Sequence, residues 1–285
     1  MGDDDGQQED PRVRRRAHSS DRGRGMSALT TPRGDRIVYD DLGTPGAPTA
    51  VFIAGAGPTR ADDPITLATG EAFAALGGRA LIADRLGRGE SISEGPIELT
   101  AQLDAIEALA RDAEAPVILI GHSSGCAIAM LTASRLPELA GLVLWEAPLG
   151  LFEGGAPSWW ARVRESIDAG DLEEAVARYM IGMPPEWLEE LKKSPDYPGL
   201  IHSWIPDGEA LAAVEESGYR NALAPVAAPV VALVGTETFP GMIATADALA
   251  EAAPDGRSEQ LAGAWHSWEP QAMAERLARL AGMAL

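Results

Sequence analysis

Apolar runs alternate with helical stretches along most of this chain. Four of the runs are apolar at every position, at residues 51–53, 80–83, 117–120 and 230–234. Continuous apolar runs of this length are typical of parallel strands that are covered on both faces. Their alternation with stretches rich in Ala, Leu and Glu predicts a mostly parallel α/β sheet with helices on both faces.

Gly, Pro and charged residues between the runs set the bounds of the elements. We expect strands at residues 36–39, 49–53, 79–83, 116–120, 142–145, 229–234 and 257–261, and helices at residues 99–112, 124–136, 242–253 and 270–281.

The alternation breaks between residues 147 and 223. This segment has no strand-like run, prolines separate its short acidic helices, and four of the seven tryptophans lie in it. We therefore expect residues 151–222 to form a helical cap, inserted into a core that consists of residues 26–150 and 223–285.

Residues 1–25 differ from the rest of the chain. They contain six acidic residues and six arginines but almost no apolar side chains. Such a segment buries too little apolar surface to offset the entropy of ordering it. We expect a disordered tail, and because no apolar stretch follows the arginines at 14–16, we do not expect an export signal.

Composition narrows the class of protein. A chain of 285 residues with 46% hydrophobic residues can bury about three quarters of the surface that it exposes when unfolded. A net charge of −20 disfavours nucleic acid as a partner, and no apolar run is long enough to span a membrane. The single cysteine, Cys126, excludes an intrachain disulfide and indicates a reducing, cytoplasmic compartment. We expect a monomer or homodimer without a metal site.

The strongest chemical signal is the pentapeptide GHSSG at residues 121–125. It follows the apolar run 117–120 and precedes a helical stretch, which is the setting of a nucleophile elbow. Gly121 and Gly125 leave room for close neighbours, and the helix N-terminus behind Ser123 favours negative charge. The pattern predicts Ser123 as a nucleophile at the carboxyl end of the sheet.

Two more motifs accompany the elbow. Residues 84–91, DRLGRGES, match an Asp-x-x-Gly-x-Gly-x-Ser turn, and residues 263–266, GAWH, match a C-terminal Gly-x-x-His loop. With the elbow, they resemble the α/β-hydrolase superfamily from about residue 36 to the C-terminus. The resemblance implies the α/β-hydrolase fold, with His266 as the general base. His18 in the tail, His122 in the elbow and His202 in the cap are the other histidines, and we expect His122 to pack without titrating.

Residues 52–57, FIAGAG, resemble the oxyanion segment of this superfamily, with Ala54 where many members have His. Gly55 is the glycine of that segment. The resemblance implies that the backbone N–H groups of Ser124 and of Ala56 or Gly57 face the developing oxyanion.

Two glutamates are candidates for the acid that orients His266. Superfamily members commonly carry an Asp after the strand at 229–234, but residues 235–238 read GTET, which leaves Glu237 one position early. Glu146 follows the strand next to the elbow in a Glu-x-Pro pattern, which resembles that of members such as zearalenone lactone hydrolase. Because neighbouring parallel strands lie about 4.8 Å apart, a carboxylate there can reach the imidazole. We favour Glu146 and keep Glu237 as the alternative.

A serine at position 123 distinguishes this chain from dehalogenases and epoxide hydrolases, whose elbow carries a carboxylate. It favours hydrolysis of a carboxylic ester or lactone through an acyl-enzyme, with no cofactor. Large aromatic rings near the site predict a pocket for a small, moderately hydrophobic substrate. The expected lining residues are Trp145, Trp159, Trp160, Trp187, Trp204 and Trp265.

The sequence leaves alternatives to ester hydrolysis. A protein that keeps the pocket and turns over slowly would act as a ligand-binding protein. The same triad also serves C–C bond hydrolysis and perhydrolysis. A dinucleotide-binding oxidoreductase is disfavoured, because the Gly55-x-Gly57 pair lacks the third glycine of that fingerprint.

Overall fold

The computed structural model describes residues 25–57, 59–193 and 197–284. The expected tail lies outside the described residues except for Gly25.

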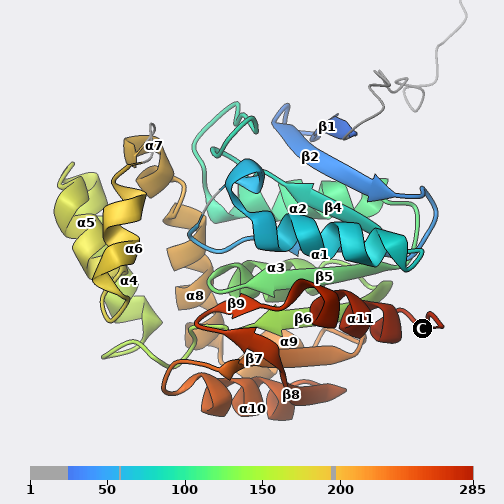
Figure 1. Ribbon diagram of the computed structural model, residues 1–285. Coiled ribbons are helices and arrows are strands. Elements are labelled where there is room, and N and C mark those ends of the chain that lie inside the picture. The colour runs from blue at the N-terminus through green and yellow to red at the C-terminus, as the bar shows by residue number, and fades with distance from the viewer. Residues whose placement is uncertain (1–24, 58, 194–196, 285) are drawn as a thin grey trace, which may run out of the picture.

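A nine-stranded sheet with the order β1-β2-β4-β3-β5-β6-β7-β8-β9 forms the centre of the molecule (Figure 1). Strands β4, β3, β5, β6, β7 and β8 are parallel, whereas β1, β2 and β9 pair antiparallel at the two edges. The strands are β1 Met26–Thr30, β2 Arg36–Gly43, β3 Thr49–Ile53, β4 Arg79–Ala83, β5 Val117–His122, β6 Leu139–Trp145, β7 Val230–Glu237, β8 Gly256–Ala264 and β9 Ser267–Trp268.

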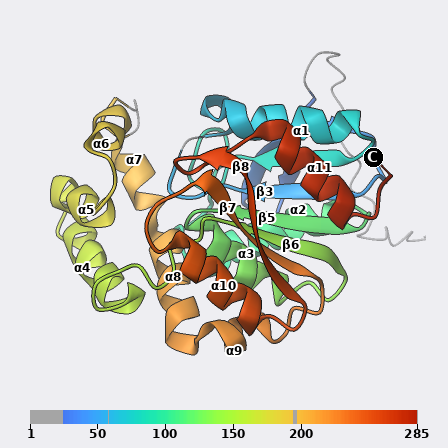
Figure 2. The ribbon, with the colours of Figure 1, turned by 60° about the horizontal axis from the view of Figure 1, so that its bottom comes forward.

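Helices cover both faces of the sheet. The helices outside the segment between β6 and β7 are the short η1 Arg60–Asp62, α1 Pro64–Ala75, α2 Leu99–Asp112, α3 Gly125–Ala133, α10 Met242–Ala252 and α11 Pro270–Leu280. Figure 2 shows α1 and α11 on one side of the sheet and α3 and α10 on the other. Successive strand residues alternate between two buried clusters, so that Val51 packs with α2 and α3 while Phe52 packs with α1 and α11.

The sequence predicted most of these elements, with β3, β4 and α2 at their observed bounds. It missed β1 and β9, which are short edge strands with little apolar signal, and α1. Helix α1 contains Gly70, where an added Cβ would lie 2.9 Å from an Ile82 methyl group. A glycine lowers the helical signal in the sequence, but here it allows the helix to pack closely on the sheet.

The segment between β6 and β7 is helical. Its helices are α4 Ala156–Asp168, α5 Leu172–Tyr179, α6 Pro185–Leu191, α7 Tyr197–His202, α8 Ile205–Ser217 and α9 Tyr219–Leu223. Helices α4 to α7 form a lobe beyond the edge where the parallel strands end, and α8 runs between this lobe and the core (Figure 1). Helix α8 packs against both α4 and α3, so it connects the cap to the elbow helix.

None of the helices in the described ranges is long and apolar enough to cross a membrane.

Candidate active site

Ser123 lies in a sharp turn between β5 and α3. Its φ is +55°, a left-handed value that is strained for a residue with a side chain. The N–H of Ser123 donates a hydrogen bond to Trp145 O at 2.9 Å, which ties the turn to the neighbouring strand. An added Cβ at Gly121 would lie 2.5 Å from Cys126 Cα, and one at Gly125 would contact the carbonyl of Ile53. Both glycines are therefore required by close backbone packing.

His266 lies in the two-residue turn between β8 and β9. Both turn residues have positive φ, +49° at Trp265 and +78° at His266, as a type I′ turn requires. Neither is a glycine, so neighbouring groups must hold the turn. The carbonyl of His266 accepts hydrogen bonds from the indole N–H of Trp145 at 3.1 Å and from Nε2 of His122 at 2.9 Å. These two bonds hold the backbone of His266 in place and so position its imidazole.

His122 supports the site without being a candidate for proton transfer. Burial, with a further contribution from His266, lowers the pKa of His122 to about 4. The ring is therefore neutral at pH 7, and its Nε2–H donates to the His266 carbonyl. The rings of His122 and His266 lie 4.7 Å apart between centroids. The sequence indicated that His122 packs without titrating, but it gave no sign of this hydrogen bond.

Glu146 lies at the carboxyl end of β6, and its side chain is buried. Its Oε2 is 2.7 Å from Nδ1 of His266, and its Oε1 accepts from Gly235 N–H at 3.0 Å and from the Thr238 hydroxyl at 2.5 Å. Burial by itself raises the pKa of Glu146, but the bonds from His266, Thr238 and Gly235 outweigh it and lower the pKa below its usual value. The carboxylate is thus ionised and oriented toward the imidazole.

The alternative acid is not in this arrangement. The side chain of Glu237 is exposed at the end of β7, and the next residue, Thr238, donates to Glu146 instead. The structure therefore brings Glu146 to His266, and the threonine stands where the superfamily commonly has its acid. In the sequence, Thr238 stood out only because an Asp is common at its position. In the structure, the Thr238 hydroxyl donates a hydrogen bond to Glu146.

Ser123 Oγ and Nε2 of His266 make no hydrogen bond in the part of the chain that the structure describes. His122, the residue before Ser123, contacts the His266 ring, and Trp145, the residue before Glu146, bonds the Ser123 backbone. These contacts place the backbones of the three expected residues near one another at the carboxyl edge of the sheet. Hydrogen bonds between a nucleophile and its base are often formed only once substrate is bound.

The segment after β3 lies against the elbow. An added Cβ at Gly55 would lie 2.8 Å from both His122 O and Ser123 Cβ, so only glycine fits there. Across the described residues, the backbone N–H groups of Ala56, Gly57 and Ser124 donate to no protein acceptor. Ser124 also precedes the first residue of α3, where helix geometry leaves N–H groups free.

A cavity of about 440 Å³ opens beside His266, between the cap and the core. Most of its lining is apolar, and three charged residues lie among the rest. The lining residues are Pro148, Leu151, Phe152, Glu153, Trp159, Arg162, Arg178, Ile181, Gly182, Met183, Phe239, Pro240, Met242 and His266.

The six tryptophans expected in a pocket take different positions. Trp159 lines the cavity, the ring of Trp187 lies 6.1 Å from that of His266, and Trp265 is 57% exposed. Trp145, Trp160 and Trp204 are buried and do not line the cavity. Trp145 packs edge-on against Trp268 beneath the His266 turn, and the other two join the packing between cap and core. We expected these three residues to line the pocket, but in the structure they pack in the interior.

Within the described residues, no group of three or more His, Cys, Asp or Glu is arranged to hold a metal ion.

Comparison with known proteins identifies the family. Residues 50–280 match the Alpha/beta hydrolase family. The chain belongs to this family. A curated relative, Lipase LipV of Mycobacterium tuberculosis, is 39% identical over 88 residues, which cover 30% of this chain and 31% of the relative. The match thus spans about a third of that lipase.

Solved alpha/beta hydrolase structures share the fold over nearly the whole chain. An α/β hydrolase from Sphaerobacter thermophilus has a TM-score of 0.69 at 20% identity, covering 89% of this chain and 99% of its own. An esterase from Thermogutta terrifontis has a TM-score of 0.61 at 19% identity, covering 90% and 95%. The α/β-hydrolase fold expected from the sequence motifs is confirmed.

Proposed function

We propose that this protein is a serine hydrolase that cleaves a carboxylic ester or lactone of a small, moderately hydrophobic substrate. The observation that carries the proposal is the hydrogen bond of 2.7 Å between Nδ1 of His266 and Oε2 of Glu146, next to a serine in a strained elbow. A buried carboxylate that orients an imidazole beside a serine is the arrangement that activates a hydroxyl nucleophile.

In the proposed acylation step, Ser123 Oγ attacks the carbonyl carbon of the substrate. His266 Nε2 accepts the hydroxyl proton, and the carbonyl electron pair moves to the oxygen. The free N–H groups of Ser124 and Ala56 stabilise that oxyanion, an effect worth about 2.7 to 4 kcal/mol for one donor where it has been measured. Collapse of the intermediate breaks the bond to the leaving oxygen, which takes the proton from His266.

Deacylation repeats these roles with water. His266 accepts a proton from the attacking water, the new tetrahedral intermediate collapses, and Ser123 recovers its proton as the carboxylic acid leaves. Glu146 keeps Nδ1 protonated and stabilises the positive charge that His266 carries in each transition state. In a lactone the alcohol stays attached to the acyl group, so one hydroxy acid is released.

The size and lining of the cavity support the substrate class. About 440 Å³ lies within the usual range for sites that bind small molecules. Apolar side chains such as Phe152, Met183 and Phe239 favour a hydrophobic group next to the reacting carbonyl.

The test is a panel of chromogenic esters and of lactones, assayed with the wild-type protein and Ser123→Ala. We expect turnover of neutral, short to medium acyl groups by the wild type and none above background by the variant. Binding of these compounds without turnover by the wild type would contradict the proposal and favour the ligand-binding alternative.

A further inference from the structure

Asp207, in helix α8 at the base of the cap, is fully buried and contacts three residues of the core. Its Oδ1 accepts from Arg85 Nη1 at 2.6 Å and from the Ser124 hydroxyl at 2.7 Å. Its Oδ2 accepts from Arg88 Nη2 at 3.0 Å. One carboxylate therefore joins the residue after the expected nucleophile to two buried guanidinium groups.

The two arginines also bind the expected oxyanion segment. Arg85 Nη1 donates to Ala54 O at 2.9 Å, and Arg88 Nη1 donates to Gly55 O. The rest of the Arg88 guanidinium is fixed by Ser203, whose hydroxyl accepts from Arg88 Nε at 2.9 Å. The side chains of Arg85 and Arg88 are each 1% exposed, so water does not compete for these bonds.

The bond from Arg88 to the Gly55 carbonyl sets the direction of the Ala56 N–H, one of the proposed oxyanion donors. In a trans peptide the C=O and the following N–H point in opposite directions, and rotation about the peptide bond is blocked. The peptide of Gly55 O carries the N–H of Ala56, and no cis peptide occurs in the described chain. Because Arg88 holds the carbonyl on the buried side, the Ala56 N–H is directed to the other side.

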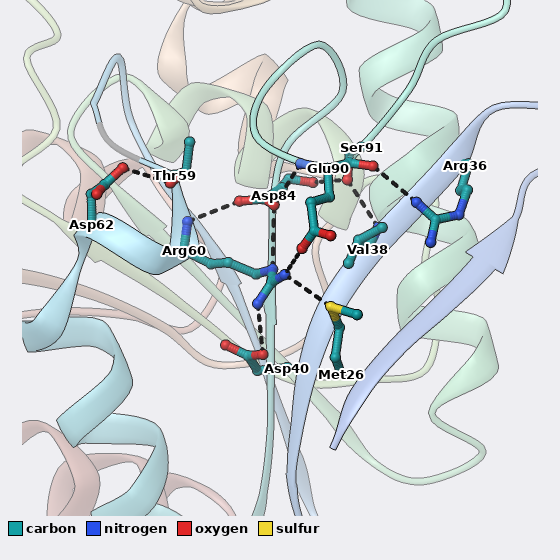
Figure 3. A network of polar contacts seen from close by, with 10 residues as sticks. All are labelled: Met26, Arg36, Val38, Asp40, Thr59, Arg60, Asp62, Asp84, Glu90 and Ser91. Atoms are coloured by element: carbon teal, nitrogen blue, oxygen red, sulfur yellow. Dashed lines mark hydrogen bonds and ion pairs between the residues drawn. The ribbon is translucent and has the colours of Figure 1, made fainter. Parts of the chain in front are cut away.

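A second group of contacts anchors the same segment farther along, at Arg60 (Figure 3). The backbone N–H of Arg60 donates to Asp84 Oδ1 at 2.9 Å, and its guanidinium pairs with Asp84, Asp40 and Glu90. Asp84 Oδ2 accepts from the Glu90 N–H at 3.0 Å. The turn at residues 84–91 thus holds the segment at two places, through Asp84 and through its two arginines.

We propose that Asp207 is a positioning residue for the oxyanion hole, acting through Arg85 and Arg88 on the peptides of residues 54–56 and through its bond to Ser124. This inference rests on the proposed function. It also means that a residue on the cap side of the fold sets the geometry of the catalytic donors. The site is complete only when α8 is seated on the core.

The charge of the cluster favours the same role. Two guanidinium groups against one carboxylate leave one net positive charge beneath the oxyanion segment. Burial, together with the neighbouring Arg85, lowers the pKa of Arg88 to about 10, so Arg88 stays charged at neutral pH. A fixed positive charge behind the donors stabilises negative charge that develops in front of them.

The experiment compares Asp207→Asn with Asp41→Asn. Asp41 forms a bidentate pair with buried Arg79 at the opposite edge of the sheet, with both bonds at 2.7 Å, and contacts no residue of the site. Each variant removes one charge from an ion pair with a buried arginine, so Asp41→Asn controls for lost stability. Thermal unfolding first establishes the temperature at which both variants are folded, and kinetics are measured there.

We expect kcat of Asp207→Asn to fall by about 10- to 100-fold with KM within about twofold, since only transition-state contacts are affected. The affinity for a trifluoromethyl ketone, whose adduct with serine carries an oxyanion, should fall by a similar factor. Asp41→Asn should match the wild type in both measurements. Equal kinetics for the two aspartate variants would overturn the inference while leaving the proposed function intact.

Arg88→Lys serves as a second variant, because it keeps the positive charge but loses the planar set of donors. We expect the same loss in kcat and in affinity for the ketone, though smaller than in Asp207→Asn. If Asp207→Asn does not fold, an Arg88→Lys variant with wild-type kinetics overturns the inference. A wild-type protein with no ester turnover would overturn the proposed function and this inference together.

Discussion

The parallel strands end at two opposite edges of the sheet, which we call the carboxyl edge and the amino edge after the strand ends that meet there. The residues at these two edges differ in backbone conformation. At the carboxyl edge, Ser123, Glu146, Trp265 and His266 all have positive φ. The one other non-glycine residue with positive φ in the described chain is Glu114, which lies at the amino edge. Such conformations cost about 1 to 3 kcal/mol each and persist where surrounding contacts hold them. Backbone strain is thus concentrated where the expected chemistry lies.

Buried ion pairs show the same contrast. At the amino edge Arg79 and Asp41 form a one-to-one pair, and Arg79 also donates to the carbonyl of Ala113 at 3.2 Å. At the carboxyl edge Asp207 holds two arginines, and these reach the backbone beside Ser123. The pair at the amino edge joins structural elements. The cluster at the carboxyl edge orients the peptides whose N–H groups are the proposed oxyanion donors. Perturbing each edge separately should therefore affect different properties.

The largest effect is expected from His266→Ala. Loss of the base removes proton transfer in both steps, so kcat should fall by about 10⁴- to 10⁶-fold while the protein remains folded. The measurement is steady-state hydrolysis of the best ester from the panel, with unfolding curves to verify the fold. A variant that keeps more than a tenth of wild-type activity would remove His266 from the mechanism.

The next largest effect distinguishes the two glutamates. Glu146→Gln keeps the size of the side chain but loses the charge that orients His266, so we expect kcat to fall by about 10²- to 10⁴-fold. Glu237→Gln, one strand away with an exposed side chain, should stay within about twofold of the wild type. The reverse result would make Glu237 the acid.

A smaller effect concerns the stability of the carboxyl edge. The pKa of His122 is about 4 in the folded protein, below the value of about 6.5 for an unfolded chain. Between these values the unfolded chain binds more protons, so the free energy of unfolding falls as pH is lowered from about 6.5 toward 4. At 1.36 kcal/mol per pKa unit, the loss is at most about 3 kcal/mol.

Urea unfolding from pH 4 to pH 8 measures this effect, with His122→Gln as the matched variant. Glutamine does not titrate but can donate to the His266 carbonyl. The lowered pKa of Glu146 adds a stability loss in the same acidic direction, and it is common to both proteins. The difference between the two proteins should therefore report His122, and parallel pH dependences would contradict the assignment.

The smallest effect is expected at the amino edge. Glu114 follows the C-terminal end of α2 with a φ of +51°, the position where helices commonly end in glycine. Glu114→Gly removes the strain of a left-handed side chain, and we expect a gain of about 0.5 to 1 kcal/mol in the free energy of unfolding. Activity should be unchanged. A loss of activity would show that strain at the two edges is coupled.

The sequence predicted the parts of the fold that depend on local pattern. Continuous apolar runs identified β3 and β4, because a strand that is covered on both faces is apolar over most of its length, and the expected bounds of both strands match the structure. The elbow was predictable because its glycines, serine and flanking elements are contiguous. Edge strand β1, with its alternating exposure, carried too little signal, and Gly70 obscured helix α1.

Contacts between distant residues were beyond the sequence. Arg85 and Asp207 are 122 positions apart, and neither residue predicts the other. The choice between Glu146 and Glu237 depends on which strand end directs its side chain to the imidazole, and periodicity does not give that direction. For the same reason the sequence placed six tryptophans around the substrate pocket, although Trp145, Trp160 and Trp204 are buried and do not line the cavity.

The central claim is that Ser123 is a nucleophile activated by His266. Its most direct test is labelling with a fluorophosphonate, followed by intact-mass and peptide-mass analysis of the wild type, Ser123→Ala and His266→Ala. We predict one adduct on the wild type, located at Ser123, no adduct on Ser123→Ala, and a greatly slowed reaction for His266→Ala. A folded wild-type protein that takes up no label, or an adduct that persists on Ser123→Ala, would contradict the claim.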